Sequence, residues 1–214
     1  MIRAVIFDMD GLLVDSETPG LTGIQVCARR QGVEIPLEHV RRTLGINAHA
    51  AAAFYHPLYP TLDTGRLFRD FADYMHDLAL QGGIPLKKGA KELLSALRER
   101  GVPCAVASSS DEGTIRLYLE HLGVAAYFRA LISASGDMPS KPAPDIFLKA
   151  ARILGAAPGE CLVLEDSVSG VKAGRAAGMQ VGMIPDLIPY TQALSPFCDH
   201  VLPDLAAVVP LLDA

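Results

Sequence analysis

Two aspartates, separated by one residue, follow a short hydrophobic segment near the N-terminus. The segment is AVIF, residues 4–7, and the stretch after it reads DMDGLLVDSE, starting with Asp8 and Asp10. Aspartate is disfavoured within strands, and two negative charges close together repel each other. The pair therefore either marks a simple turn after a buried strand or contributes oxygen ligands to a cation.

Polar residues also follow two later hydrophobic segments. The segment PCAVA leads into the hydroxyls of Ser108, Ser109 and Ser110, and the segment CLVL leads into Glu165 and Asp166. Taken alone, each cluster is more simply explained as the cap of a following helix. Three clusters, each at the end of an expected strand, indicate one shared site, because doubly wound sheets bind ligands beyond the carboxyl ends of their strands.

One lysine, Lys141, lies in the segment SKPAPDIF, where Pro142 and Pro144 restrict the backbone. By itself it is most simply a solvated residue. Together with the carboxylates and hydroxyls it completes a set that suits a phosphate and a hard cation. Mg²⁺ uses few carboxylates, keeps several waters and shares its coordination shell with phosphate. We therefore expect a Mg²⁺ ion, which would offset the repulsion among the carboxylates.

The elements that must position these residues alternate between helix and strand from about residue 89 onward. Hydrophobic residues at helical spacing separate short, nearly continuous hydrophobic segments. This pattern is typical of a parallel sheet covered by helices on both faces. We predict an α/β fold built on a doubly wound, Rossmann-like parallel sheet. Residues 4–8 should form a central strand, and a helix should end the chain after a last strand at 200–202.

Residues 17–83 differ from the rest of the chain. They show helical patterns and no convincing strand; the expected helices are residues 20–30, 37–44, 48–55 and 65–80. We interpret this block as a small α-helical domain inserted into an α/β core domain formed by residues 1–16 and 84–214. Pro19 and Gly20 disfavour a regular first turn in its first helix.

The composition is ordinary for a soluble protein. The 214 residues carry a net charge of −5, so we expect no surface for nucleic acid. No hydrophobic run approaches the ~18 residues of a membrane span. The four cysteines are widely spaced, which suggests reduced thiols. We predict a cytoplasmic protein that is a monomer or a weak homo-oligomer.

Four segments together resemble the motifs of the haloacid dehalogenase (HAD) superfamily: DMDGLLVDSE, VASSS, SKPAPDIF and LEDSVSG. They are most similar to its branch of β-phosphoglucomutase-like phosphatases and mutases. The resemblance covers essentially the whole chain, and the helical insertion is similar to the small cap domain of that branch. It implies phosphoryl transfer on a small phosphorylated metabolite.

The resemblance also implies a role for each motif residue. Asp8 corresponds to the nucleophile that forms an aspartyl-phosphate. Asp10 corresponds to the general acid and base, and the dehalogenases of the superfamily lack an acid there. Mg²⁺ would be held by Asp8, the carbonyl of Asp10 and Asp166, with Glu165 as a ligand or as a partner of the ligands.

The phosphoryl group has its own implied contacts. Ser108 and the backbone amide of Ser109 would hold the transferring phosphoryl oxygens. Lys141 would neutralise charge on the phosphoryl group and on Asp8.

Two departures from the branch's pattern favour a phosphatase over a mutase. The mutases carry a histidine at the position of Gly20, and basic residues near the segment LGINAH, residues 44–49, which has no lysine or arginine here. A mutase must retain a doubly phosphorylated intermediate, which is difficult without those groups. The sequence thus predicts a Mg²⁺-dependent phosphatase that hydrolyses small phosphorylated metabolites, such as sugar phosphates, through an aspartyl-phosphate. A phosphosugar mutase and a catalytically idle phospho-ligand-binding or regulatory protein are the alternatives.

Overall fold

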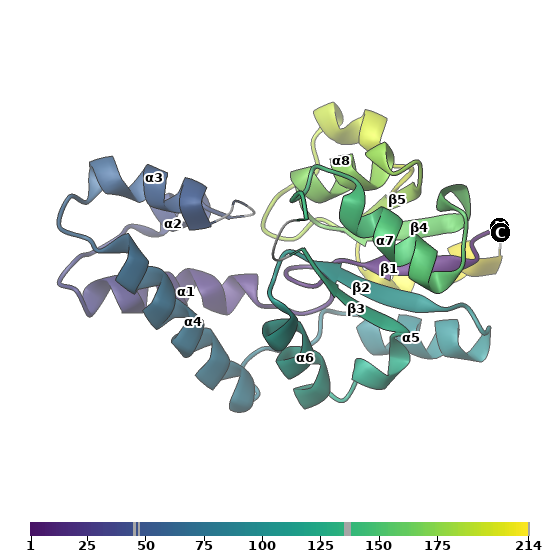
Figure 1. The fold of residues 1–214 in the computed structure, drawn as a ribbon, viewed down its shortest axis with the longest axis horizontal. Coiled ribbons are helices and arrows are strands. Elements are labelled where there is room, and N and C mark those ends of the chain that lie inside the picture. The colour runs from purple at the N-terminus through teal and green to yellow at the C-terminus, as the bar shows by residue number, and fades with distance from the viewer. Residues whose placement is uncertain (45, 47, 135–137, 214) are drawn as a thin grey trace. The chain divides into compact units, whose positions relative to one another are not determined.

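The computed structural model describes residues 1–44, 46, 48–134 and 138–213. It divides into two compact units (Figure 1). The α/β unit comprises Met1–Asp15 and Pro85–Ala214, and the helical unit comprises Ser16–Ile84. Residues 45 and 47 of the LGINAH segment lie outside the described residues.

The α/β unit contains a six-stranded parallel sheet in the order β3-β2-β1-β4-β5-β6. The strands are β1 (Ala4–Phe7), β2 (Cys104–Ser108), β3 (Ala130–Ser133), β4 (Cys161–Glu165), β5 (Gln180–Met183) and β6 (His200–Val201). The predicted doubly wound sheet with the first strand at its centre is confirmed. Every residue of β1 is buried, as its continuous hydrophobic sequence predicts.

Four α-helices connect the strands: α5 (Ala90–Glu99), α6 (Glu112–His121), α7 (Asp145–Leu154) and α8 (Val168–Ala176). Short 3₁₀ segments complete the unit: η1 (Ala125–Tyr127), η2 (Pro158–Glu160), η3 (Gln192–Phe197) and η4 (Leu205–Asp213). The predicted C-terminal helix is therefore wrong in type, since η4 is 3₁₀. Pro210 lies inside it, and proline removes a backbone donor and clashes with the preceding turn of an α-helix.

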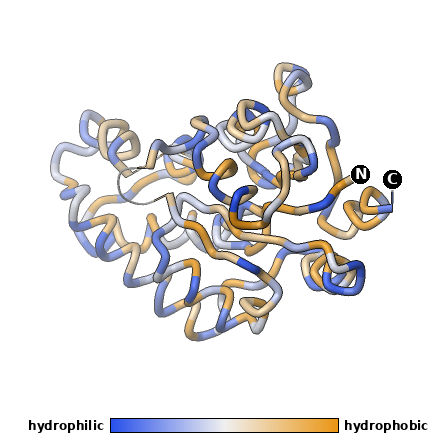
Figure 2. Tube along the Cα trace, turned by 45° about the vertical axis from the view of Figure 1, so that its right-hand side comes forward, coloured by the Kyte–Doolittle hydropathy of each residue, from blue (hydrophilic) through white to orange (hydrophobic). Residues whose placement is uncertain are grey.

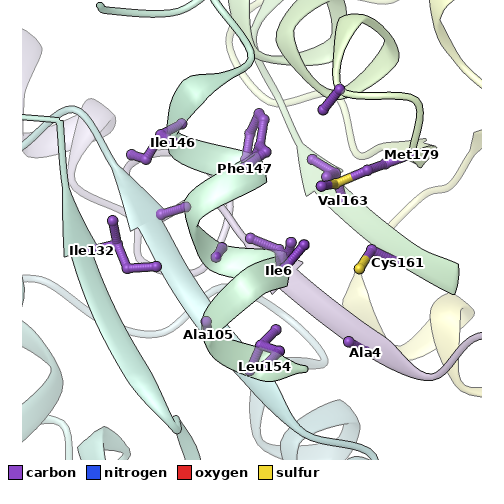
Figure 3. Packing of buried hydrophobic residues seen from close by; sticks show 14 of the residues in the cluster. Ala4, Ile6, Ala105, Ile132, Ile146, Phe147, Leu154, Cys161, Val163 and Met179 are labelled. Carbon is purple, nitrogen blue, oxygen red and sulfur yellow. The ribbon is translucent and has the colours of Figure 1, made fainter. Parts of the chain in front are cut away.

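One hydrophobic core cluster of the α/β unit lies between α7 and the centre of the sheet. Ile146 and Phe147 of α7 form one hydrophobic cluster with Ile6 and Val163 of the two central strands, as Figure 3 shows. These four side chains are fully buried. Burial of each contributes about 1.5–3 kcal/mol relative to an exposed side chain. This packing fixes the central strands, whose carboxyl ends carry the predicted site.

The helical unit consists of α1 (Glu17–Arg29), α2 (Leu37–Arg41), α3 (Ala48–Leu58) and α4 (Thr64–Leu80). Its helices alternate between hydrophobic and hydrophilic residues, as Figure 2 shows, and α1 packs against α4. Despite Pro19, α1 is regular from Glu17, because proline in the first turn removes a donor that has no intrahelical partner. Among the described residues, no helix has the length and hydrophobicity of a membrane span.

Candidate active site

The register of the sheet brings the predicted residues to one edge. Phe7, the last residue of β1, aligns with Val106 of β2 and with Leu164 of β4. The residues that follow these positions are therefore neighbours, and the Asp8 amide donates to the Leu164 carbonyl at 3.0 Å. Asp8 thus begins the loop after β1 with its backbone still held by the sheet.

Lys141 joins the ends of three adjacent strands. Its ammonium donates to Oδ1 of Asp8 after β1, to the Ala107 carbonyl of β2 at 3.1 Å, and to Oε1 of Glu165 in β4 at 2.7 Å. The side chain is only 5% exposed. Burial disfavours its charge, but the Asp8 and Glu165 carboxylates outweigh that effect and raise the pKa of Lys141. Lys141 is therefore charged and hydrogen-bonded to the ends of three strands, and it is not the solvated residue that its sequence alone suggested.

Glu165 is fully buried, and protein donors surround both of its carboxylate oxygens. Oε1 accepts from Lys141, while Oε2 accepts from the Asp166 amide at 3.2 Å and from the amide and hydroxyl of Ser167 at 3.2 and 2.9 Å. Ser167 is also the N-cap of α8, so the carboxylate lies where the helix dipole favours negative charge. Glu165 is thus an anchor for Lys141 and for the first turn of α8.

Three buried carboxylates form a set that fits a divalent cation. Oxygens of Asp8, Glu165 and Asp166 all lie within 4.8 Å of one another. Burial raises the pKa of Asp8 to about 8, with Lys141 acting in the opposite direction and the Glu165 and Asp10 carboxylates raising it further. One ammonium therefore does not offset the negative charge gathered here. A hard cation with oxygen ligands, such as Mg²⁺, suits this donor set.

Asp10 lies in a tight turn at the same edge and is held by two hydroxyls. Its Oδ2 accepts from Ser108 at 3.2 Å and from Ser110 at 2.7 Å. The turn requires Gly11, whose φ of 79° lies in the left-handed region, and the Gly11 amide donates to the Val14 carbonyl at 3.0 Å. Asp10 is partly exposed, whereas Asp8 is buried.

Six of the seven predicted residues therefore have side-chain contacts at this edge of the sheet. Lys141 is bonded to Asp8 and Glu165, Asp166 lies beside these two carboxylates, and Ser108 is bonded to Asp10. The seventh, Ser109, follows β2 directly and its side chain is exposed, which is compatible with a role for its amide alone. Sequence reasoning placed Ser110 in the hydroxyl cluster after the second strand but gave no role to it or to Gly170, which lies directly against the Glu165 carboxylate. Both lie inside the motifs VASSS and LEDSVSG, so their positions were visible but their contacts were not.

Comparison with known proteins gives the same family as the motifs. The family model for haloacid dehalogenase-like hydrolases matches residues 2–178. Hexitol phosphatase B of Escherichia coli is 31% identical over 86% of this chain and 84% of its own length. The fructose-1-phosphate phosphatase YqaB of the same organism is 30% identical over 82% of this chain and 92% of its own length.

Solved structures of this family share the fold of the chain. A HAD family hydrolase from Deinococcus radiodurans, crystallised with phosphate and sodium, is 29% identical over 99% of this chain and 95% of that one, with a TM-score of 0.81. A β-phosphoglucomutase from Clostridium difficile shares the fold, with a TM-score of 0.77 at 22% identity over 97% of this chain and 93% of that one.

The chain belongs to the haloacid dehalogenase-like hydrolases. Within that family it is an enzyme of the phosphoric monoester hydrolase class.

Proposed function

We propose that this enzyme hydrolyses small phosphorylated metabolites, sugar phosphates in particular, through an aspartyl-phosphate on Asp8, with Mg²⁺ as its cofactor. The observation that carries the proposal is the placement of Asp8. Its carboxylate is buried at the end of the central strand and bonded to a lysine that is itself anchored by Glu165. By the family resemblance, the helical unit is the cap domain of the enzyme.

In the first step, Asp8 attacks phosphorus and the bond to the leaving oxygen breaks. Asp10, in its acid form, donates a proton to that oxygen, so that a neutral alcohol leaves. In the second step, Asp10 takes a proton from water, which attacks phosphorus and releases phosphate from Asp8. Asp10 suits both steps because it lies two residues after Asp8 and is partly exposed.

Ser108 and the Ser109 amide are assigned to the phosphoryl oxygens, where donors stabilise the negative charge of the transition state. All three protons of the Lys141 ammonium have acceptors on the protein. We therefore assign Lys141 chiefly to Asp8, whose orientation and charge it stabilises, and only through Asp8 to the phosphoryl group.

Asp8, the Asp10 carbonyl and Asp166 would hold Mg²⁺, which supplies positive charge to Asp8 and to the phosphoryl oxygens. Glu165 is the least suited of the predicted ligands, because four donors already occupy its oxygens. We assign it to the support of Lys141 and of the backbone at Asp166.

The substrate class is supported by the two relatives named for hexitol and fructose 1-phosphate phosphatase activity. It is tested by measuring phosphate release from a panel of sugar and polyol phosphates with Mg²⁺ present. Asp8→Asn should lower turnover at least ~10³-fold, because the amide is a poor nucleophile and the covalent step is lost. Chelation with EDTA should abolish activity, and added Mg²⁺ should restore it.

The matched control is Asp145→Asn, which changes an exposed aspartate in the first turn of α7 and should keep wild-type turnover. Wild-type rates in Asp8→Asn, or an active enzyme in excess EDTA, would contradict the proposal. The same panel addresses the mutase alternative, since a mutase converts one sugar phosphate into its isomer without releasing phosphate.

A further inference from the structure

Ser110 makes a contact that the proposed mechanism does not use. Its hydroxyl donates to Oδ2 of Asp10 at 2.7 Å, which is shorter than the 3.2 Å bond from Ser108 to the same oxygen. Ser110 lies two residues beyond the end of β2 and precedes Asp111, the N-cap of α6. It belongs to the motif VASSS, yet its side chain contacts the loop after β1.

The backbone of Ser110 is held on both sides of the residue. Its amide donates to the Ser108 hydroxyl at 3.0 Å, and its carbonyl accepts from the Ser133 hydroxyl of β3 at 2.7 Å. The position of the Ser110 side chain is therefore fixed by β2 and β3, which are rigid elements of the sheet. A donor fixed in this way can hold a neighbouring carboxylate in one orientation.

The two hydroxyls on Asp10 cannot both remain there during catalysis. A serine hydroxyl has a single proton to donate, and Ser108 now donates it to Asp10. When Ser108 donates this proton to a phosphoryl oxygen instead, Asp10 loses the hydrogen bond from Ser108. The proposed mechanism gives the Ser110 hydroxyl no contact with phosphate, so its hydrogen bond keeps Asp10 in place while Ser108 binds phosphate.

We propose that Ser110 is a positioning residue that orients Asp10 for proton transfer, separately from the phosphate contact made by Ser108. The inference rests on the proposed role of Asp10 as general acid and base. It assigns the two serines of one turn to different parts of the reaction. Loss of the Ser110 hydroxyl should therefore impair proton transfer without impairing phosphoryl binding.

The test compares leaving groups that differ in their need for a proton. p-Nitrophenolate leaves without protonation, whereas the alkoxide of a sugar or glycerol phosphate requires it. The variants are Ser110→Val and Ser110→Thr, which have the same shape and differ in the hydroxyl. In Ser110→Val, kcat/KM for glycerol phosphate or the best sugar phosphate should fall ~10–100-fold, while kcat/KM for p-nitrophenyl phosphate should change less than ~3-fold.

A second readout separates positioning from a loss of folding. Hydrolysis of the aspartyl-phosphate also needs Asp10, so kcat of Ser110→Val with p-nitrophenyl phosphate should fall and KM should fall with it. Ser110→Thr should restore both parameters to within a few-fold of wild type. Ser108→Ala should instead lower kcat/KM for both substrates, because it removes a phosphoryl contact.

Equal losses on both substrates in Ser110→Val would overturn the inference, and so would wild-type kinetics on the sugar phosphate. Ser195→Ala, an exposed serine of η3, serves as the control for a neutral substitution. Failure of the proposed function would be distinct. In that case the wild type would release no phosphate from any monoester, or Asp10→Asn would match the wild type.

Discussion

Gly170 offers a direct test of how the buried carboxylate network is built. It is the third residue of α8, and Glu165 lies immediately against it. A Cβ atom added at Gly170 would overlap the carboxyl group of Glu165. Replacement of glycine by alanine within a helix ordinarily stabilises it by about 1 kcal/mol. At Gly170 the structure predicts the opposite sign.

The magnitude follows from what Glu165 would lose. Its carboxylate cannot simply rotate away, because it is fully buried and bonded to Lys141, to the Asp166 amide and to Ser167. Breaking a buried ion pair costs about 3–5 kcal/mol. After subtraction of the helical gain, Gly170→Ala should lower the free energy of unfolding by about 2–4 kcal/mol. For a chain of this size that corresponds to a fall in Tm of roughly 5–15 °C.

Calorimetry of the purified variant gives the Tm, and Gly159→Ala is the matched control. Nothing lies within 4 Å of a Cβ atom at Gly159, so this variant should be within about 1 kcal/mol of wild type. Gly170→Ala should also lose phosphatase activity below its Tm, because displaced Glu165 no longer anchors Lys141. If Gly170→Ala is as stable as the control, the carboxylate does not occupy the first turn of α8 and the assignment of Glu165 as an anchor is refuted.

Two further perturbations probe buried groups of the α/β unit, one in the same carboxylate network and one among the cysteines. Lys141→Met should lower the free energy of unfolding by about 3–5 kcal/mol in urea titrations, because Asp8 and Glu165 would lose their shared buried cation; a loss below 1 kcal/mol would contradict the ion-pair geometry. Ellman's reagent at pH 8 should modify Cys198 first, because it is partly exposed and the other three cysteines are buried. Burial also raises the pKa of Cys104 to about 12, so little of its reactive thiolate is present. Rapid modification that persists in Cys198→Ser would contradict this order.

The strands of the site could be predicted because each is a short segment whose own residues indicate a buried strand. The segment AVIF is hydrophobic on both faces, and such a short segment between turn signals is typical of a strand in the middle of a covered sheet. The polar residues after β1, β2 and β4 then had to share one edge. The order of the outer strands depends on packing between distant segments, which a single sequence does not display. The 3₁₀ form of η4 had a local signal in Pro210, which the prediction of a C-terminal helix did not use.

The contacts within the site were less predictable than its members. Lys141 could be placed near phosphate by its motif, but the sequence does not show that its three donors reach Asp8, Ala107 and Glu165. Ser110 was one of three consecutive serines with identical chemistry. Only their places at the end of β2 distinguish them: Ser108 is buried as the last residue of the strand, Ser109 is exposed, and the hydroxyl of Ser110 donates to Asp10.

The two aspartates that open the site require different environments because the proposed reaction asks different things of them. A nucleophile must remain ionised, whereas a general acid and base must gain and lose a proton in each cycle. Asp8 is buried beside a lysine and two further carboxylates, a setting in which the proposed cation would favour its charged form. Asp10 is partly exposed and bonded to neutral hydroxyls, which can hold a carboxyl group in either protonation state. Residues 8 and 10 of an extended strand would lie on the same face, so their different surroundings come from the turn that follows β1: Met9 between them is fully buried, and Gly11 after them takes the left-handed φ of 79° that ends the extended backbone.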